Sequence, residues 1–295
     1  MKQEPEGVAM AQFVSPLRYP GGKRKLAPFV DDLIVQNDIQ NGTYVEPFAG
    51  GASVALYLLF KESVKQVIIN DFDRSIYAFW YSATNSTEDL CRRIRDIGVT
   101  VDEWERQKKV QAKKCDADLL DLGLSTFFLN RTNRSGIMDG GIIGGRSQSG
   151  DWRMDARFNK DDLIKRIARV GAYRDRIEVY NEDAMAFVDD IKSSIDARTL
   201  IYFDPPYYNQ GSALYANHYT HRDHELLAQY IQHLDCRWML TYDNTPQIVS
   251  MYDKAERRLL SLNYTAARKG RGYEMLAFST GLTIPQGCYP SVLIE

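Results

Sequence analysis

The feature that most constrains how this chain can fold is a short apolar run that ends abruptly in an acid and two prolines, residues 199–208 (TLIYFDPPYY). Apolar, β-branched and aromatic runs closed by turn residues are typical of strands that are buried on both faces of a sheet. Two consecutive prolines cannot donate backbone hydrogen bonds, so the strand must end at Asp204. The carboxylate therefore stands at the carboxyl end of a core strand, where open α/β sheets bind their ligands.

This arrangement suits the binding of a planar amine. Asp204 and the carbonyl of Pro205 can accept the two hydrogens of an exocyclic amino group, while Pro206 stiffens the turn and the ring of Tyr207 stacks on the heterocycle. Such acceptors draw the nitrogen lone pair out of conjugation and aim it at an electrophile. Taken alone, the motif is also compatible with an acid at a strand end followed by a rigid turn, so the rest of the chain must decide.

The overall composition indicates an ordinary globular protein. The 295 residues are enough for a sizeable core and for one or two domains. The contents of 44% hydrophobic and 26% charged residues match those of soluble proteins. A net charge of −2 argues against a wholly basic nucleic-acid binder but leaves room for a local basic face.

The sequence also favours a cytoplasmic location. No apolar run approaches the length of a membrane span, and the first twelve residues lack the apolar core of a signal peptide. The four cysteines have no paired spacing, which indicates free thiols in a reducing compartment rather than a disulfide or zinc framework. They are Cys91, Cys115, Cys236 and Cys288.

The first half of the chain alternates turns, strands and helices. Residues 1–14 have no periodicity and predict a loose tail. The segment from Tyr19 to Lys23 (YPGGK) predicts a flexible turn that leads into a helix over about 23–36. Backbone amides and Lys23 at a helix start suit a carboxylate, although the segment alone also fits a solvated basic turn.

A strand, a glycine turn and a helix are predicted over residues 43–60, with Phe48 and Gly50 in the turn. Glycines at such a turn let the backbone approach a ligand closely. A second strand over 66–69 ends at Asn70 and Asp71. Because Asp71 follows the glycine turn by about 20 residues, it has the usual offset of an acid that binds ribose hydroxyls.

From Ser86 the pattern becomes helical and strongly charged. Three helices are predicted over 86–97, 101–114 and 118–130, the first opened by a capping box of Ser86 and Asp89. Helical pattern is then lost over 131–158, and a loop this long inside a compact domain is commonly functional. Arginine and asparagine, which read guanine and adenine edges bidentately, occur in it, although a surface loop of mixed charge is the plain alternative.

The α/β alternation resumes after this loop. Helices are predicted over 160–170, 184–191, 221–234 and 246 onward, and strands over 177–180 and 237–242. The last two strands, over 258–262 and 274–279, have no helix between them and should pair as an antiparallel hairpin. The polar segment 209–220 is a candidate mobile flap.

Three histidines, His218, His221 and His224, are spaced three apart. They straddle a loop-to-helix boundary and lack further ligands, so we predict no metal site.

Taken together, these segments resemble the Dam-type family of adenine-specific DNA methyltransferases. The resemblance covers most of the chain and follows the family order: Tyr19-Pro-Gly-Gly-Lys23, Phe48-Ala-Gly-Gly51, Asn70-Asp71, an inserted recognition region, Asp183 and Asp204-Pro-Pro-Tyr207. The glycine turn departs from the family's Phe-x-Gly-x-Gly pattern, because Ala52 and Ser53 follow Gly51. The loop over 131–158 matches the DNA-reading region in position but poorly in sequence, so site preference is not carried over.

The resemblance implies a Rossmann-like methyltransferase sheet of seven strands, mostly parallel with the last strand antiparallel, and an inserted, mainly helical target-recognition domain. In this division residues 1–14 are a tail, 15–84 and 176–295 form the catalytic domain, and 85–175 form the recognition domain.

The resemblance also implies the cofactor S-adenosyl-L-methionine and a set of site residues. Tyr19 and Lys23 would contact its methionine portion, Phe48 and Gly50 would form the floor of the site, and Asp204 would lie between cofactor and target. Asp71 would hold the ribose and Asp183 the adenine ring. The expected catalytic residues are Asp204, Pro205, Pro206 and Tyr207. The expected DNA-binding residues are Arg131, Asn133, Arg134, Arg146, Lys269 and Arg271.

The implied activity is methyl transfer to N6 of an adenine flipped out of double-stranded DNA. Methylation of cytosine N4 stays open because the pocket chemistry is the same, whereas protein glutamine methylases favour Asn in place of Asp204. A DNA-binding regulator with a vestigial cofactor pocket is disfavoured by the full set of motifs, and a nicotinamide dehydrogenase by the incomplete glycine fingerprint. A homodimer and a cognate restriction endonuclease remain open as further partners.

Overall fold

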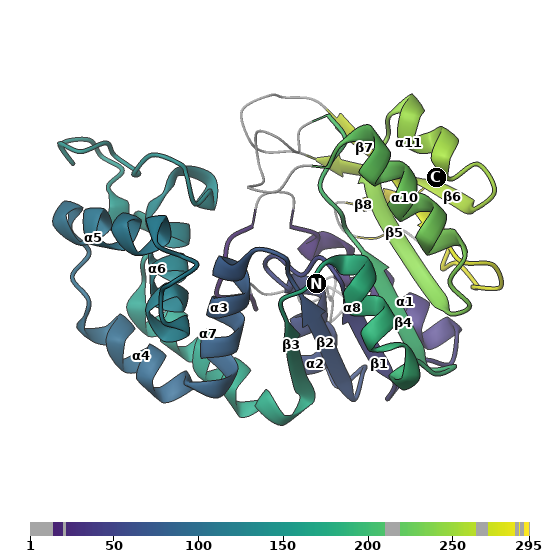
Figure 1. Ribbon diagram of the computed structural model, residues 1–295, viewed down its shortest axis with the longest axis horizontal. Helices are drawn as coiled ribbons and strands as arrows, with labels where there is room; N and C mark the ends of the chain where they lie inside the picture. The colour runs from purple at the N-terminus through teal and green to yellow at the C-terminus, as the bar shows by residue number, and fades with distance from the viewer. Residues whose placement is uncertain are drawn as a thin grey trace, which may run out of the picture.

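The computed structural model describes residues 14–19, 22–209, 219–263, 271–286, 289 and 292–294. Its centre is one eight-stranded sheet in the order β3-β2-β1-β4-β5-β7-β6-β8 (Figure 1). The strands are β1 (Thr43–Glu46), β2 (Gln66–Asn70), β3 (Ile177–Tyr180), β4 (Thr199–Phe203), β5 (Arg237–Asp243), β6 (Glu256–Asn263), β7 (Arg271–Phe278) and β8 (Val292–Ile294).

The strand directions confirm the expected methyltransferase sheet. Strands β3, β2, β1, β4 and β5 are paired in parallel, and β7 is antiparallel to both β5 and β6. The expected final hairpin is therefore present, with Arg258 opposite Leu276. The short strand β8, which pairs antiparallel with β6, is an addition to the seven strands that we expected.

Strand β4 is buried along its whole length, as its continuous apolar run predicts. Leu200 and Tyr202 belong to the core on one face of the sheet, and Ile201 and Phe203 belong to the core on the other face. The alternation of a strand therefore places both halves of the run against helices.

Helices cover both faces of the sheet. The first face packs against α1 (Ala27–Gln36), α2 (Ser53–Phe60) and α3 (Arg74–Asn85). The second face packs against α8 (Ala184–Asp190), α10 (His221–Gln232) and α11 (Pro246–Met251). Helix α11 begins as expected, since the Thr245 side chain accepts a hydrogen bond from the amide of Ile248 and Pro246 occupies the first turn. Helix α3 was not predicted from the sequence.

The segment between β2 and β3 adds a group of helices at the β3 side of the sheet (Figure 1). They are α4 (Thr87–Asp96), α5 (Val101–Ala112), α6 (Leu119–Thr132) and α7 (Lys160–Ala172). Helix α3 joins them to the sheet, because it packs against α6 and α7. The rings of Phe79 on α3 and Phe127 on α6 stack with centroids 5.9 Å apart.

Two details of these helices differ from the expectation. Ser86 occupies the N-cap position of α4 but its side chain makes no capping hydrogen bond, so the predicted capping box is wrong. Helix α6 continues through Arg131 to Thr132, past its expected end at Asn130. The remaining 3₁₀ turns are η1 (Arg24–Leu26), η2 (Arg134–Gly136), η3 (Met154–Arg157), η4 (Arg174–Arg176) and η5 (Lys192–Ser194).

The carboxyl ends of β1, β2, β3 and β4 meet at one edge of the sheet because these strands run parallel. Asn70 ties three of these ends together. Its amide nitrogen donates to the carbonyls of Pro47 (3.0 Å) and Glu182 (3.1 Å), and its oxygen accepts from the amide of Glu182 (2.9 Å). The chain is therefore held together where it leaves the carboxyl ends of β1, β2 and β3.

Within the described ranges, none of the helices combines the length and the apolar character that crossing a bilayer requires.

Candidate active site

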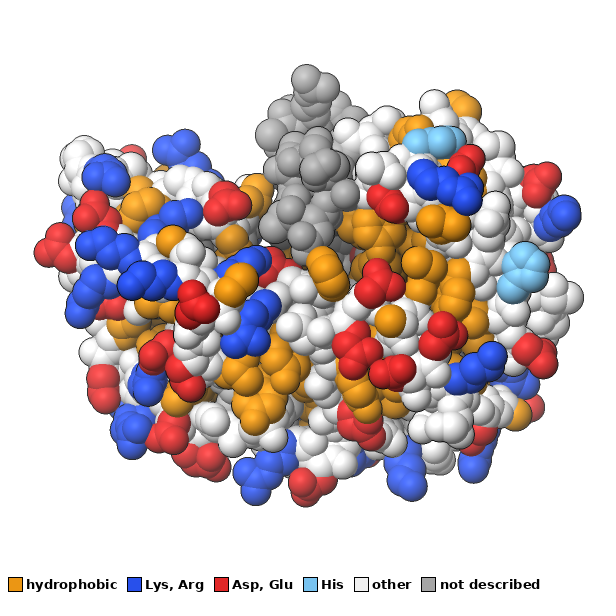
Figure 2. Space-filling model, in the orientation of Figure 1, with side chains coloured by type: hydrophobic (Ala, Val, Ile, Leu, Met, Phe, Trp, Pro, Cys, Tyr) orange, Lys and Arg blue, Asp and Glu red, His pale blue; other side chains and the backbone are white. Residues whose placement is uncertain are grey.

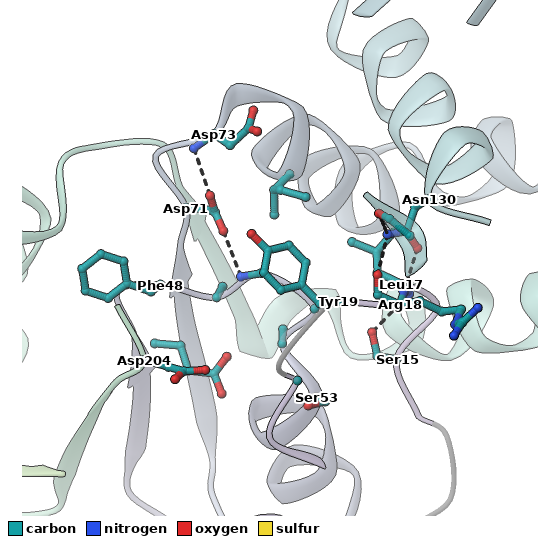
Figure 3. A pocket seen from close by; sticks show the side chains of 18 of the residues that line it. Ser15, Leu17, Arg18, Tyr19, Phe48, Ser53, Asp71, Asp73, Asn130 and Asp204 are labelled. Atoms are coloured by element: carbon teal, nitrogen blue, oxygen red, sulfur yellow. Dashed lines mark hydrogen bonds between the residues drawn. The ribbon is translucent and has the colours of Figure 1, made fainter. Parts of the chain in front are cut away.

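A cavity of about 1680 Å³ opens at this edge of the sheet, between the strand ends and the inserted helices (Figure 3). Several of the residues predicted from the sequence line it. These are Tyr19, Lys23, Phe48, Gly50, Asp71, Asp183, Asp204 and Pro206. The fold therefore gathers motifs that lie up to 187 positions apart in the chain (Tyr19 to Pro206) around one space.

Asp204 follows β4 directly, and its side chain is 23% exposed. Its Oδ1 atom accepts a hydrogen bond from Thr241 Oγ1 (2.7 Å) and lies 2.8 Å from Lys23 Nζ in an ion pair, and its Oδ2 atom accepts a hydrogen bond from Lys23 Nζ at 3.1 Å. The hydroxyl of Tyr202 lies 2.7 Å from Thr241 Oγ1. The carboxylate is thus held in one orientation by an ammonium group and a hydroxyl.

Burial raises the pKa of the Asp204 carboxyl above its ordinary value, and the positive charge of Lys23 opposes that rise. For Lys23, burial alone would lower the pKa. The nearby carboxylates of Asp204 and Glu274 outweigh burial and raise the pKa well above its ordinary value. Lys23 is therefore a buried cation that opposes the rise of the Asp204 pKa.

Glu274 on β7 is part of the same network, and the sequence analysis missed it. Its side chain is buried, its Oε1 atom accepts a hydrogen bond from the hydroxyl of Tyr207, and its Oε2 atom lies 3.4 Å from Lys23 Nζ. It comes to the site because the β5–β7 register places it opposite Asp243. No motif or spacing in the sequence signals that pairing.

The turn after Asp204 differs in one respect from the expectation. Tyr207 is 8% exposed and does not line the cavity, so the prediction that its ring is placed to stack on a ligand there is wrong. Its hydroxyl instead accepts from Lys23 Nζ at 3.0 Å. The carboxylate of Asp243 accepts the backbone amides of Tyr208 (2.9 Å) and Asn209 (3.2 Å), which fixes the far side of the turn.

The glycine turn after β1 is shaped around Tyr19. Gly50 has a φ of +46°, and a Cβ atom there would lie 2.8 Å from the Tyr19 ring. The amide of Gly50 donates to Asp71 Oδ2 at 2.9 Å, and its carbonyl accepts from the indole nitrogen of Trp80 at 2.9 Å. Glycine is required here because the tyrosine ring lies directly on the backbone.

The acids at the ends of β2 and β3 also face the cavity. Asp71 accepts the amides of Gly50 and Asp73 (2.9 Å each), and burial raises its pKa to about 7. Asp183 is exposed and caps α8, with its Oδ1 atom accepting from the amide of Met185 at 3.0 Å. Phe72, which the sequence analysis did not single out, is 59% exposed and lines the cavity beside Asp71.

One further buried acid lines the cavity. Glu46 ends β1 and is 4% exposed, and its Oε1 atom accepts the amide of Ala55 at 3.0 Å. Burial raises its pKa to about 8. Glu46 belongs to none of the sequence motifs described above, so it was not predicted as a site residue.

Comparison with known proteins decides the family. The family model of the D12 class N6 adenine-specific DNA methyltransferases matches residues 19–266. This chain belongs to that family. The enzyme is therefore an N6 adenine-specific DNA methyltransferase, as the motif order predicts. A curated relative from Methanocaldococcus jannaschii, the type II methyltransferase M.MjaIII, is 26% identical over an alignment of 278 residues that covers 88% of this chain and 87% of the relative.

A crystal structure of protein LPL1258 from Legionella pneumophila also matches, with 9% identity over 91% of this methyltransferase and 85% of that chain. At a TM-score of 0.32 the two structures are too different for their folds to be compared in detail.

The residues that we expected to bind DNA divide into three groups. For Arg131 and Asn133 the prediction is corrected, because both side chains are buried and hydrogen-bonded within the protein. Arg131 is 7% exposed and donates to the carbonyl of Pro16. Asn133 is fully buried, accepts from the Trp104 indole (2.7 Å) and donates to the carbonyls of Ile137 and Met138 (2.8 and 2.9 Å). Both side chains are engaged in hydrogen bonds within the protein.

The other four expected DNA-binding residues remain predictions. Arg134 and Arg146 are exposed, and Arg146 lies 3.0 Å from Glu105. Lys269 lies outside the described residues, and only the backbone of Arg271 is described, at the start of β7. On the face drawn in Figure 2, lysine and arginine side chains are mixed with acidic ones over the inserted helices.

Two of the three histidines pair with tyrosines. His221 Nδ1 lies 3.0 Å from the Tyr208 hydroxyl, and His224 Nδ1 is hydrogen-bonded to the Tyr242 hydroxyl. Burial lowers the pKa of His224. His218 and most of the segment 209–220 lie outside the described residues.

Proposed function

We propose that this methyltransferase binds S-adenosyl-L-methionine in the cavity and uses Asp204 to hold N6 of an adenine that has been rotated out of duplex DNA. The observation that carries this proposal is the position of Asp204: an acid at the carboxyl end of the central strand, facing a cavity and paired with a buried lysine. The carboxyl edge of such a sheet is where α/β proteins bind nucleotides.

The residues of the cavity fit this cofactor. The Asp71 carboxylate already accepts two backbone amides and has further lone pairs for the hydroxyls of a ribose. Phe72 offers an exposed aromatic ring to a purine, and Asp183 offers a carboxylate oxygen to the amino group of that purine. The Tyr19 ring, seated on Gly50, forms one wall of the cavity (Figure 3).

The target amine would be held by two acceptors. Asp204 Oδ1 accepts a hydrogen bond from Thr241 and is paired with Lys23, whereas Oδ2 accepts a hydrogen bond from Lys23 and retains capacity for an amine hydrogen. The Pro205 carbonyl accepts the second hydrogen. The cofactor supplies a methyl group that is already activated by a positive sulfur, so the task of these residues is to orient the nitrogen lone pair. The proton leaves after the bond to carbon has formed.

An adenine inside a duplex cannot reach Asp204, so we propose that it is flipped out at a cost of a few kcal/mol. Because Tyr207 does not face the cavity, its expected stacking role passes to Phe48, Pro206 and Tyr219, which line the cavity beside Asp204. The rings of Phe48 and Tyr219 meet edge to face, with centroids 6.2 Å apart. Stacking on such a wall contributes about 1–3 kcal/mol per base.

We propose that residues 85–175 form the target-recognition domain and that 15–84 and 176–295 form the catalytic domain. The support is that α4 to α7 lie together beside the sheet and that Arg134 and Arg146 are exposed on the segment that follows α6. Arginines that reach a major groove pair bidentately with guanine.

The test is methylation of DNA by purified protein with S-adenosyl-L-methionine, followed by mass analysis of the nucleosides. We expect N6-methyladenine from the wild type and at least a thousandfold lower rate from Asp204→Ala, with cofactor binding retained. Asp253→Ala, which removes an exposed acid, is the matched control. Full activity of Asp204→Ala, or N4-methylcytosine as the product, would contradict the proposal.

A further inference from the structure

Asn130, near the end of α6, holds the backbone of the residue that precedes Tyr19. Its Oδ1 atom accepts the amide of Arg18 at 2.7 Å, and its Nδ2 atom donates to the carbonyl of Arg18 at 2.6 Å. Figure 3 shows the two residues joined by these hydrogen bonds, with Tyr19 next to them over the cavity. The Asn130 side chain therefore bonds to both backbone groups of Arg18, as the backbone of a neighbouring strand would.

Three further contacts fix the same segment. Arg131 Nε donates to the carbonyl of Pro16 at 2.8 Å, and Arg166 Nη1 on α7 donates to the carbonyl of Ser15 at 3.3 Å. The backbone of Arg18 crosses Gly136 so closely that a Cβ atom there would lie 2.6 Å from its carbonyl oxygen. Every one of these partners comes from the segment between β2 and β3.

Tyr19 follows directly, and its ring lies on Gly50 and its Cβ beside Gly51. The position of the ring is therefore set from two sides: the glycine turn lies beneath it, and the inserted helices hold the backbone that carries it. Asn130 is 1% exposed, and its Nδ2 atom also donates to the carbonyl of Gly136 at 3.1 Å.

We infer that Asn130 is a positioning residue for the cofactor site: the helical segment that we propose to recognise DNA also fixes the Tyr19 wall of the cavity. This inference rests on the proposed function, since it requires that the cavity holds S-adenosyl-L-methionine. Asn130 acts through Arg18 and Tyr19 and does not itself touch the reacting atoms.

Replacing Asn130 by alanine removes both hydrogen bonds to Arg18, so Tyr19 is held less firmly on the glycine turn. We expect the dissociation constant for S-adenosyl-L-methionine, measured by calorimetry without DNA, to rise about tenfold, which corresponds to the loss of about one net hydrogen bond. We expect the KM for the cofactor to rise similarly while kcat at saturating cofactor changes less than twofold.

Asn133→Ala is the matched control. Asn133 is one turn away and equally buried, and its side chain makes as many hydrogen bonds, but its partners Trp104, Ile137 and Met138 all lie within the inserted segment. A merely structural loss would weaken cofactor binding equally in both variants. We expect the two melting temperatures to fall by similar amounts and only Asn130→Ala to lose cofactor affinity.

A double variant separates this inference from the proposed function. If Asn130 acts through Tyr19, Tyr19→Ala with Asn130→Ala binds the cofactor no more weakly than Tyr19→Ala alone. Additive losses, or equal losses in Asn130→Ala and Asn133→Ala, overturn the inference while the proposed function stands. If the wild type does not bind S-adenosyl-L-methionine, or if Asp71→Ala leaves its binding unchanged, the proposed function itself fails.

Discussion

The carboxyl edge of the sheet and the end of α6 both carry polar side chains, and the protein uses them differently. At the sheet edge, Asp71, Asp183 and Asp204 line the cavity, as expected. At the end of α6, Asn130 and Arg131 turn inward and bind a segment 112 and 115 positions away in the chain. A strand end in a parallel sheet has a fixed location, whereas the partner of a helix end depends on which distant segment crosses it.

The largest expected effect concerns the charges around Asp204, which must be ionised to accept amine hydrogens. Lys23→Met removes the cation that opposes the rise of the Asp204 pKa, so the pKa rises further and the acidic limb of the activity profile moves to higher pH by about one unit or more. We also expect a rate loss on the order of a hundredfold near neutral pH. The measurement is kcat against pH at saturating cofactor and DNA.

Glu274→Gln is the opposing variant. The negative charge of Glu274 raises the pKa of Asp204, so its removal lowers that pKa and moves the acidic limb to lower pH. The glutamine oxygen can still accept the Tyr207 hydroxyl. If the acidic limb of the activity profile moved in the same direction in Lys23→Met and Glu274→Gln, that limb would report the ionisation of a group other than Asp204.

The next prediction contrasts two arginines three positions apart, the buried Arg131 and the exposed Arg134. Arg131→Ala leaves the buried carbonyl of Pro16 without this donor, and we expect about 2–4 kcal/mol of lost stability, read as a lower melting temperature. Arg134→Ala removes an exposed side chain, so the melting temperature should not change. We expect it to weaken binding to the recognised duplex about ten- to hundredfold and to relax the sequence preference at one position.

The recognised duplex for this experiment comes from sequencing methylated DNA of cells that express the protein. A stability loss in Arg134→Ala, or relaxed specificity in Arg131→Ala without a stability loss, would reverse the assignment of the two side chains.

The smallest expected effect compares two helix starts, one on each side of the molecule. Thr245 accepts the amide of Ile248 at the start of α11, so Thr245→Ala should cost about 1 kcal/mol of stability in denaturant unfolding. Ser86 at the start of α4 makes no capping hydrogen bond, so Ser86→Ala should change stability by less than about 0.3 kcal/mol. Equal losses would mean that the Ser86 hydroxyl caps α4 in solution.

Much of the fold follows from local sequence patterns. The apolar run of β4, the glycine turn at Gly50 and the Thr245 cap each indicate an element through residues that touch one another along the chain. The parallel sheet and the final hairpin follow because helices separate the early strands and none separates the last two. Helix α3 was missed although it is amphipathic, and it matters because it joins the inserted helices to the sheet.

In the candidate site too, the residues that could be predicted are those that local motifs mark. Motif residues at strand ends face the cavity because their positions are fixed by the sheet. Glu274 and Thr241 could not be predicted from spacing along the chain. Thr241 reaches Asp204 through the pairing of β4 with β5, and Glu274 reaches Lys23 through the register of β5 and β7. Tyr207 belongs to the expected motif, yet its hydroxyl is drawn into the lysine–glutamate network and its ring away from the cavity.

The three hydrogen bonds of Asn70 have a consequence for how such enzymes diversify. Because Asn70 bonds to the chain that follows β1 and to the chain that follows β3, these strand ends are held together without help from the roughly hundred residues between β2 and β3. Chimeras that exchange this portion between relatives should therefore preserve the strand order, provided that each donor brings its own match for the Arg18 backbone. New target preferences would then arise by replacing one contiguous stretch of gene.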